Sequence, residues 1–348
     1  MTAHAHSEKT GSDTPQLRLV AWETTRNCNL SCQHCRASAR HGSFTGELDT
    51  TASLRLLDQI ARAGRPIVIL TGGEPLLRPD IFELAEYGTG LGLKMVMAPN
   101  GTLITEENAR RMKAAGIDRI SISIDGATAD SHDRFRGVAG AFEGALTGAS
   151  RAREAGVEFQ INTTITRANM DEIPAIMALA EESGAVAHHI FLLVPTGRGK
   201  ELAHQAISAA DYEKTLNWFY DQRQATDLQL KATCAPQYYR ILRQRARADN
   251  IKITFQSHGL DAVTRGCLGG VGFCFISHVG VVQPCGFLEL NCGDVTVEPF
   301  DRIWENSEIF QNLRNYDNLK GKCGRCEYKQ VCGGCRARAY EATGDYLA

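Results

Sequence analysis

From Leu17 to Val194, short apolar runs alternate with amphipathic stretches. The apolar runs predict six strands, at Leu17–Thr24, Pro66–Thr71, Leu93–Met97, Arg119–Ile124, Glu158–Thr164 and Ala187–Val194. The stretches between them predict helices near Thr51–Ala63, Asp80–Tyr87, Thr105–Ala115, Ala139–Ala155 and Met170–Ser183. Strands that alternate with helices form a parallel sheet, and six such units are too few to close an eight-stranded barrel. The pattern therefore predicts an α/β fold with an open, partial (β/α)6 barrel over residues 17–195.

The pattern changes after this first domain. Residues 196–260 are predicted to form a helical linker and substrate-site segment, with an amphipathic helix at Ser208–Arg223. Residues 261–348 are rich in glycine and cysteine, which predicts a loop-rich second domain. Residues 1–16 are polar and lack the apolar core of a signal peptide, so they are predicted to be a disordered tail and the protein to be cytoplasmic.

Composition narrows the class of protein without identifying it. Of 348 residues, 43% are hydrophobic and 22% charged, which is ordinary for a globular protein of about two domains. No apolar run is long enough to span a membrane, and a formal net charge of −2 gives no reason to expect a nucleic-acid partner. The twelve cysteines are grouped at metal-like spacings, which favours cluster ligands over a disulfide framework.

Three of these cysteines follow the first predicted strand at C-x3-C-x2-C spacing. Cys28, Cys32 and Cys35 therefore lie on a loop at the C-terminal end of that strand, where parallel barrels collect their chemistry. Three thiolates can hold three irons of a 4Fe–4S cube, whereas electron-transfer cubes have four cysteines. The fourth iron is left open to a small molecule, as in a catalytic metal site. A zinc loop and three free buried thiols are the alternatives.

This cysteine loop resembles the signature of radical S-adenosylmethionine (SAM) enzymes. The resemblance implies that the open iron binds SAM and that an external electron donor supports its cleavage to methionine and a 5′-deoxyadenosyl radical. It also implies a set of SAM contacts that follow the predicted strands or the cysteine loop: Gly72, Gly73, Glu74, Asn100, Ser123, Asp125, Arg136, Asn162 and His34. Of these, Gly72 to Glu74 belong to a GGEP string and Arg136 to a predicted loop at His132–Gly137. The alternatives are a plain turn and a surface arginine.

The cysteines return after Gly266, at positions 267, 274, 285, 292, 323, 326, 332 and 335. Their spacing resembles that of the SPASM domain, an auxiliary-cluster module of radical SAM enzymes, and a zinc ribbon is the alternative. The resemblance implies that one 4Fe–4S cube is held by Cys267, Cys274, Cys285 and Cys335. It implies that a second begins with Cys323, Cys326 and Cys332, and no later cysteine supplies its fourth ligand. That leaves an open iron, another ligand or a longer chain as possibilities. Cys234 is expected to be structural, and Cys292 is unassigned.

Several strings resemble the heme-biosynthesis branch of the SPASM enzymes: Leu19–Thr24, Pro66–Pro75, Pro195–Lys200, Lys231–Arg243 and Cys332–Tyr340. Within that branch the resemblance is to the enzyme that turns two propionates of iron-coproporphyrin III into vinyl groups, with an electron passing to an external acceptor. Two related enzymes of this branch remain as alternatives. One is a deacetylase of didecarboxysiroheme, and the other removes propionates during dioneheme synthesis. Physical argument from the sequence does not separate the three.

A tetra-anionic iron porphyrin needs cations at its carboxylates. The candidates are two on the loop after the sixth strand and two on the next basic helix: Arg198, Lys200, Arg240 and Arg243. A solvated basic turn and a solvated helix face are the alternatives.

Two other classes of function remain. A peptide-modifying SPASM maturase that deprotonates its substrate tends to have an acid beside a cluster cysteine, whereas Gly286 follows Cys285 here. A non-catalytic iron–sulfur electron carrier is disfavoured by the GGEP string and by the open-iron spacing of the first cysteine loop.

Overall fold

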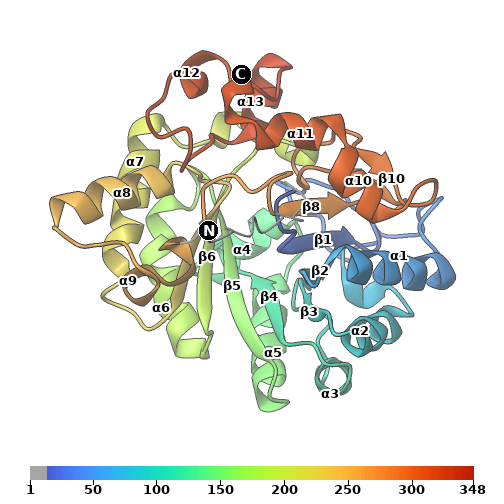
Figure 1. Cartoon of the computed structure of the whole chain (residues 1–348). Coiled ribbons are helices and arrows are strands. Elements are labelled where there is room, and N and C mark those ends of the chain that lie inside the picture. The colour runs from blue at the N-terminus through green and yellow to red at the C-terminus, as the bar shows by residue number, and fades with distance from the viewer. Residues whose placement is uncertain (1–13, 263) are drawn as a thin grey trace, which may run out of the picture.

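The computed structural model describes residues 14–262 and 264–348, and strands alternate with helices through its first half (Figure 1). The strands in this half are β1 Leu19–Glu23, β2 Ile67–Thr71, β3 Lys94–Met97, β4 Arg119–Ser123, β5 Glu158–Ile165 and β6 Ala187–Leu192. The helices are α1 Thr50–Ala63, α2 Ile81–Gly90, α3 Glu106–Ala114, α4 Ala129–Arg136, α5 Ala141–Glu154 and α6 Ile173–Ser183. All six predicted strands are confirmed, as are the five predicted helices.

Strands β1 to β6 lie side by side in sequence order, and each pair is parallel. A seventh strand, β7 (Gln229–Thr233), pairs in parallel with β6 and was not predicted in the linker. The linker also contains helices α7 (Ala209–Gln222), α8 (Tyr238–Ala248) and α9 (Phe255–His258). The predicted partial barrel is confirmed, with one strand more than the pattern indicated.

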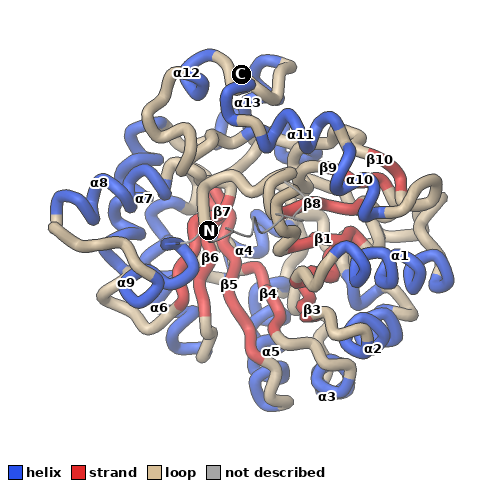
Figure 2. The backbone as a smooth tube through the Cα atoms, in the orientation of Figure 1, coloured by secondary structure: helices blue, strands red, loops and turns tan. Residues whose placement is uncertain are grey.

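The strands present two different faces. Ile120 and Ile122 of β4 are fully buried, and helix α5 packs against β4 and β5. Helices lie on this outer side of the curved sheet (Figure 2). The inner face carries half-exposed polar side chains, and the strand register aligns four of them: Ser123 opposite Asn162, Asn162 opposite His189, and His189 opposite Lys231. These four residues are called the polar row.

The C-terminal part extends the same sheet instead of forming a separate layer. Strand β8 (Phe273–Ile276) pairs in parallel with β1, and β9 (Val281–Gln283) and β10 (Gly293–Asp294) continue the sheet in antiparallel pairs. In Figure 1, β8 in orange lies beside β1 in blue. The remaining helices are short: α10 Phe300–Asn306, α11 Glu308–Arg314, α12 Gly321–Gly324 and α13 Arg336–Thr343. The loop-rich, cysteine-rich second part of the predicted fold is confirmed.

One local prediction was wrong. The segment His132–Gly137 is not a loop, because helix α4 runs to Arg136. Thr128 and Ser131 form a capping box at its start, and Gly137 ends it in the left-handed conformation at φ 72°.

The predicted disordered tail falls mostly outside the described residues. Within residues 14–16, the carbonyl of Pro15 accepts a hydrogen bond from Trp304 Nε1 at 3.2 Å. Across residues 14–262 and 264–348, no helix combines the length and the apolar character needed to cross a membrane.

Candidate active site

The first cysteine loop follows β1 and is held in place by backbone contacts from distant segments. The N–H groups of Ser31 and Gln33 donate to the carbonyls of Arg136 and Phe135, at 3.2 and 3.0 Å. Cys28 and Cys32 are buried, and they pack with Cys35 in one small core that also contains Leu30, Ala37, Ala39 and Ala141. The structure therefore brings the three predicted ligands of the first cluster together.

Each of the three thiols in this loop accepts one hydrogen bond. The N–H of Leu30 donates to Cys28 Sγ and that of Ala39 to Cys35 Sγ, both at 3.4 Å. The guanidinium of Arg136 donates to Cys32 Sγ at 3.5 Å. Burial, and to a lesser degree the charges of neighbouring groups, raises the pKa of Cys28 to about 12. Such a thiol stays protonated until a bound metal displaces its proton, whereas the donors around it suit a thiolate.

The glycines of the GGEP string are needed by the cysteine loop itself. A Cβ added to Gly72 would lie 2.4 Å from the carbonyl oxygen of Thr25, and one added to Gly73 would lie 2.4 Å from that of Asn27. The N–H of Gly73 donates to Thr25 O at 2.7 Å. The glycines thus let the end of β2 lie directly against the backbone that leads into Cys28.

Glu74 connects three loops through a buried network. Its carboxylate accepts from the N–H of Leu76 at 3.0 Å and from the N–H of Asn100 at 2.6 Å. Burial raises the pKa of Glu74 to about 7, and these two donors oppose that rise. The Asn100 amide donates to Asn29 Oδ1 at 2.7 Å, and the Asn29 amide donates to Thr102 at 2.8 Å. The pattern gave no sign of Asn29 or Thr102, which join the predicted contact Asn100 to the cysteine loop.

Arg136 lies between the first cluster loop and the end of β4. It is buried at the last residue of α4 and forms an ion pair with Asp125, whose other oxygen accepts from the N–H of Thr164 at 2.6 Å. Asp125 raises the pKa of Arg136, which stays charged although burial alone would lower its pKa. A fixed cation therefore stands beside Cys32, where it can pair with the carboxylate of a bound ligand.

Two of the predicted SAM contacts, His34 and Arg136, carry unpaired nitrogen atoms. His34 stacks on Phe135 with ring centroids 4.4 Å apart, and burial holds its pKa well below the ordinary value. Among the described residues, the buried His34 Nδ1 and Arg136 Nε have no hydrogen-bond partner. Ser123 and Asn162 are neighbours in the polar row, and Asn162 Oδ1 accepts from Gln160 at 2.9 Å. Unpaired donors beside the three thiols fit a polar ligand bound next to a cluster.

The later cysteines form three groups, and one differs from the expected set. Cys285 and Cys335 pack around the same small core as Cys234, and the N–H of Cys267 donates to the carbonyl oxygen of Cys332, which precedes Cys335 by one short turn, at 3.1 Å. Cys335 thus lies near Cys285, as expected. Cys274 does not join them, because it lies on β8 opposite Val20 and faces the main core with Cys292. A position inside a buried strand removes Cys274 from the loops that carry the other thiols.

The third group is Cys323, Cys326 and Cys332, and burial, with the other two thiols nearby, raises the pKa of Cys332. Each again accepts one hydrogen bond: Cys323 from Arg336 at 3.0 Å, Cys326 from the N–H of Tyr328 at 3.4 Å and Cys332 from the N–H of Gly334 at 3.4 Å. This repeats the pattern of the first loop. In the described part of the chain, no three His, Cys, Asp or Glu side chains lie close enough to hold a single metal ion.

The four predicted substrate cations make different contacts. Arg198 donates to the carbonyls of Cys32 at 2.9 Å and Ala39 at 2.6 Å, so it braces the first cysteine loop. Lys200 pairs with Glu341 at 3.3 Å, and Arg240 pairs with Glu213.

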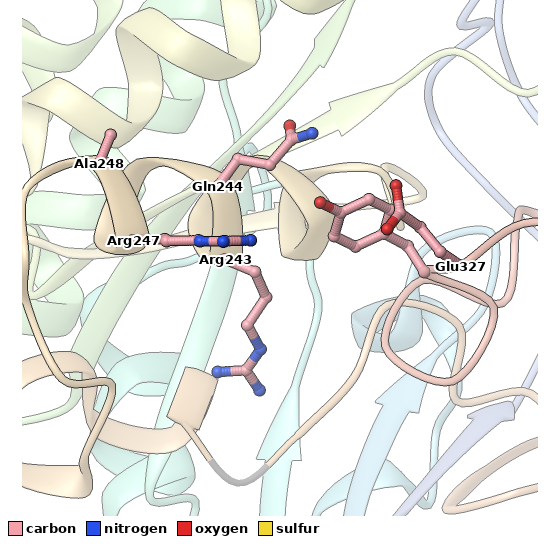
Figure 3. A pocket seen from close by; sticks show the side chains of 6 residues that line it. Arg243, Gln244, Arg247, Ala248 and Glu327 are labelled. Atoms are coloured by element: carbon pink, nitrogen blue, oxygen red, sulfur yellow. The ribbon is translucent and has the colours of Figure 1, made fainter.

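Arg243 is different, because it lines an open pocket of about 610 Å³ (Figure 3). The other residues of this pocket are Gln244, Arg247 and Ala248 of α8, together with Glu327 and Tyr328. Glu327 directly follows Cys326, so the pocket adjoins the third group of cysteines.

Comparison with known proteins agrees with this geometry. The sequence model of the Radical SAM superfamily matches residues 22–180, and that of the SPASM iron–sulfur cluster-binding domain matches residues 267–335. The chain therefore belongs to the radical SAM superfamily, in the group whose members carry a SPASM domain. It is an enzyme whose cofactors are 4Fe–4S clusters and SAM.

Particular relatives narrow the comparison. The chain is 57% identical to a protein named AdoMet-dependent heme synthase from Nitratidesulfovibrio vulgaris, over 100% of this chain and 96% of that protein. It is 31% identical to a protein named Fe-coproporphyrin III synthase from Methanosarcina barkeri, over 95% of this chain and 86% of that one. The fold is similar to that of Streptococcus suis SuiB bound to its precursor peptide, with a TM-score of 0.72 over 96% of this chain and 74% of SuiB at 16% identity.

Proposed function

We propose that this enzyme converts two propionate side chains of iron-coproporphyrin III into vinyl groups and thereby makes heme b. The difference in identity among the relatives carries the proposal. Identity to a heme synthase is 57%, and identity to an enzyme named for making Fe-coproporphyrin III is 31%, at nearly equal coverage of this chain. The simplest consequence is that this enzyme uses a substrate similar to that of the heme synthase, to which it is more similar in sequence.

The reaction balances with the cofactors of the family. When bound, the cluster and SAM supply a radical that removes one hydrogen atom from the propionate carbon next to the ring. The bond to the carboxylate carbon then breaks, carbon dioxide leaves, and the remaining pair of carbons becomes a vinyl group with one surplus electron. An acceptor must take that electron once for each propionate, and an auxiliary cluster is suited to passing it on because the protein can tune cluster potentials widely.

The residues of this chain have three tasks in such a reaction. Arg136, fixed by Asp125 beside Cys32, holds the carboxylate of SAM, and Glu74 and Asn100 shape the loop at its amino end. His34 offers an unpaired ring nitrogen to the nucleoside, and Asn162 presents its amide on the polar row. The tightly packed loops around Cys28 and Cys32 keep water from the radical.

Within the polar row, Lys231 is the side chain best suited to bind a porphyrin carboxylate. Lys231 is half-buried on the inner face of β7, and among the described residues it has no hydrogen-bond or ion-pair partner within contact distance. Burial lowers its pKa, and the more distant charge of Asp261 opposes that effect. A partly buried cation without a contact partner is better accommodated when a ligand supplies the opposite charge. We therefore add Lys231 to Arg243 as a propionate contact, whereas the contacts of Arg198 assign it to the cysteine loop.

A peptide-modifying maturase is the main alternative from another class. A Cβ added to Gly286 would lie 3.0 Å from Nε of Arg36 and 3.2 Å from the ring of Phe275. Arg36 is fixed there by an ion pair with Glu23 at 3.2 Å and by stacking on Phe275. An acidic side chain after Cys285 would have to displace Arg36, so the place where such a maturase keeps its acid is already filled.

The decisive experiment is anaerobic incubation of the reduced enzyme with SAM and iron-coproporphyrin III, with product masses as the readout. The expected product has lost carbon dioxide and two hydrogens at each of two side chains, with a singly converted intermediate on the way. Conversion of didecarboxysiroheme and not of iron-coproporphyrin III would contradict the proposal.

A matched pair of variants tests the substrate contact. Lys231→Met should weaken porphyrin binding in an absorbance titration and leave uncoupled SAM cleavage in place. Lys214→Met, which removes an exposed lysine of α7, should change neither. Equal porphyrin affinity in both variants would remove Lys231 from the substrate site.

A further inference from the structure

Cys234 lies outside the residues matched by the SPASM domain, at the point where β7 ends. It has a positive φ of 54°, a conformation that is uncommon for any residue other than glycine. Its carbonyl accepts from the hydroxyl of Tyr212 at 3.2 Å and from the guanidinium of Arg338. Arg338 also donates to the carbonyls of Leu192 and Leu193, at 2.6 and 2.8 Å. Surrounding contacts therefore hold Cys234 in an unfavourable conformation, which is typical of functional positions.

Cys234 lies near three other cysteines. Cys234, Cys285 and Cys335 pack around the buried side chains of Val194, Leu288 and Ala337. Cys267 lies beside the segment that ends at Cys335, because its N–H donates to the carbonyl oxygen of Cys332 at 3.1 Å and a Cβ added to Gly333 would lie 3.8 Å from the Cβ of Cys267. Four cysteines from four separate segments therefore lie in one region.

Two of the partners of Cys234 lie at local backbone features. The N–H of Leu288 donates to the carbonyl oxygen of Cys285 at 3.1 Å, which closes a turn after this cysteine. Cys335 is the N-cap residue of α13, where the helix dipole favours negative charge.

Cys274 lies apart from these four cysteines. Its side chain is 0% exposed inside β8, and its neighbour is Cys292 in the main apolar core. A cysteine in such a place behaves as a small apolar residue.

We propose that Cys234, Cys267, Cys285 and Cys335 are the four ligands of one auxiliary 4Fe–4S cluster, and that Cys274 is not a ligand. Four cysteines are the usual complement of such a cluster. The ligand set then includes the residue that directly follows β7, the strand that carries Lys231 of the polar row, so this cluster joins the last barrel strand to the C-terminal part. The proposal does not depend on which substrate the enzyme uses.

The test compares Cys234→Ala with Cys274→Ala as a matched control, both in the full chain after anaerobic cluster reconstitution. Alanine tolerates the φ of position 234 about as well as cysteine does, so the first variant removes only the thiol. Iron and acid-labile sulfide per chain are measured, together with the electron paramagnetic resonance spectrum of the reduced protein. SAM cleavage to 5′-deoxyadenosine, which needs only the first cluster, reports that each variant is folded.

Cys234→Ala is expected to lose about four irons per chain, or to keep them with an altered auxiliary resonance signal, while it still cleaves SAM. Cys274→Ala is expected to match the wild type in iron, sulfide and spectrum. The proposal is overturned if Cys234→Ala keeps both its iron and its spectrum, or if Cys274→Ala loses or alters them. If Cys234→Ala fails to cleave SAM, the spectrum of Cys234→Ser decides, because an oxygen ligand perturbs only a cluster that it binds.

Discussion

The first cysteine site and the auxiliary site containing Cys285 are built in opposite ways. Cys28, Cys32 and Cys35 lie within eight consecutive residues, and one loop after β1 carries all three. At the proposed auxiliary site, Cys267, Cys285 and Cys335 come from separate segments and lie near Cys234, which directly follows the last barrel strand. A local site can be recognised by spacing, whereas an assembled site depends on the sheet that brings its segments together.

The largest expected effect is at the local site. Replacing any one of Cys28, Cys32 or Cys35 by alanine should reduce 5′-deoxyadenosine formation to background, because two thiolates are too few to hold the cube. Deoxyadenosine is measured by chromatography after incubation with SAM and a reductant. Full activity in any one of the three variants would mean that this loop does not hold the first cluster.

The second-largest expected effect is a loss of folding stability when the ion pair of Arg136 with Asp125 is broken. Arg136→Gln leaves Asp125 buried without its cation, and breaking a buried ion pair in this way costs about 3–5 kcal/mol. Anaerobic urea unfolding measures the loss of stability. The double variant Arg136→Met with Asp125→Leu removes both charges and should recover part of it, and a double variant no more stable than Arg136→Gln would show that the pair itself is not the cause.

A substitution at Arg338 should weaken the auxiliary site and leave the first cysteine site intact. Arg338→Met removes the donor from the carbonyls of Leu192, Leu193 and Cys234, and each unsatisfied buried group costs about 1–3 kcal/mol. The variant should lose auxiliary iron at lower urea concentrations than the wild type, with SAM cleavage retained. Arg167→Met is a control, because Arg167 also donates to a carbonyl, that of Ala206, from an exposed position. If both variants release iron alike, the effect is not specific to the assembled site.

The smallest expected effect is a pH dependence of folding stability caused by Glu74. The folded pKa of Glu74 is about 7 against an ordinary value of 4.5, so the folded chain holds this proton more tightly than the unfolded chain does. The resulting stability is fully present below about pH 4.5 and is lost as the pH rises through about 7. The urea midpoint of the SAM-free protein should therefore fall between about pH 6 and pH 8. Glu74→Gln cannot ionise and should flatten that dependence, and an equal slope in both proteins would assign the titration to another group.

These two sites also show what sequence could predict. All six expected strands are present because alternation of buried and exposed side chains is a local property. Strand β7 was missed because its pattern is polar: Lys231 on its inner face interrupts the apolar run. The resemblance to the SPASM domain grouped Cys274 with the loop cysteines, although its position inside the apolar run Phe273–Ile276 indicates a core residue. Cys234 directly follows β7, as Asp125 comes shortly after β4, and that placement was the available signal of a functional position.

The pairing of β8 with β1 has a consequence for how this chain can be divided. Sequence comparison separates a Radical SAM unit from a SPASM unit, but β1 is hydrogen-bonded to β2 on one side and to β8 on the other. A fragment that ended before β8 would leave Leu19–Glu23 as an exposed edge strand, which is a template for aggregation. The two units are therefore not independent modules, and an exchange of SPASM units between relatives would have to preserve the fit of β8 to β1.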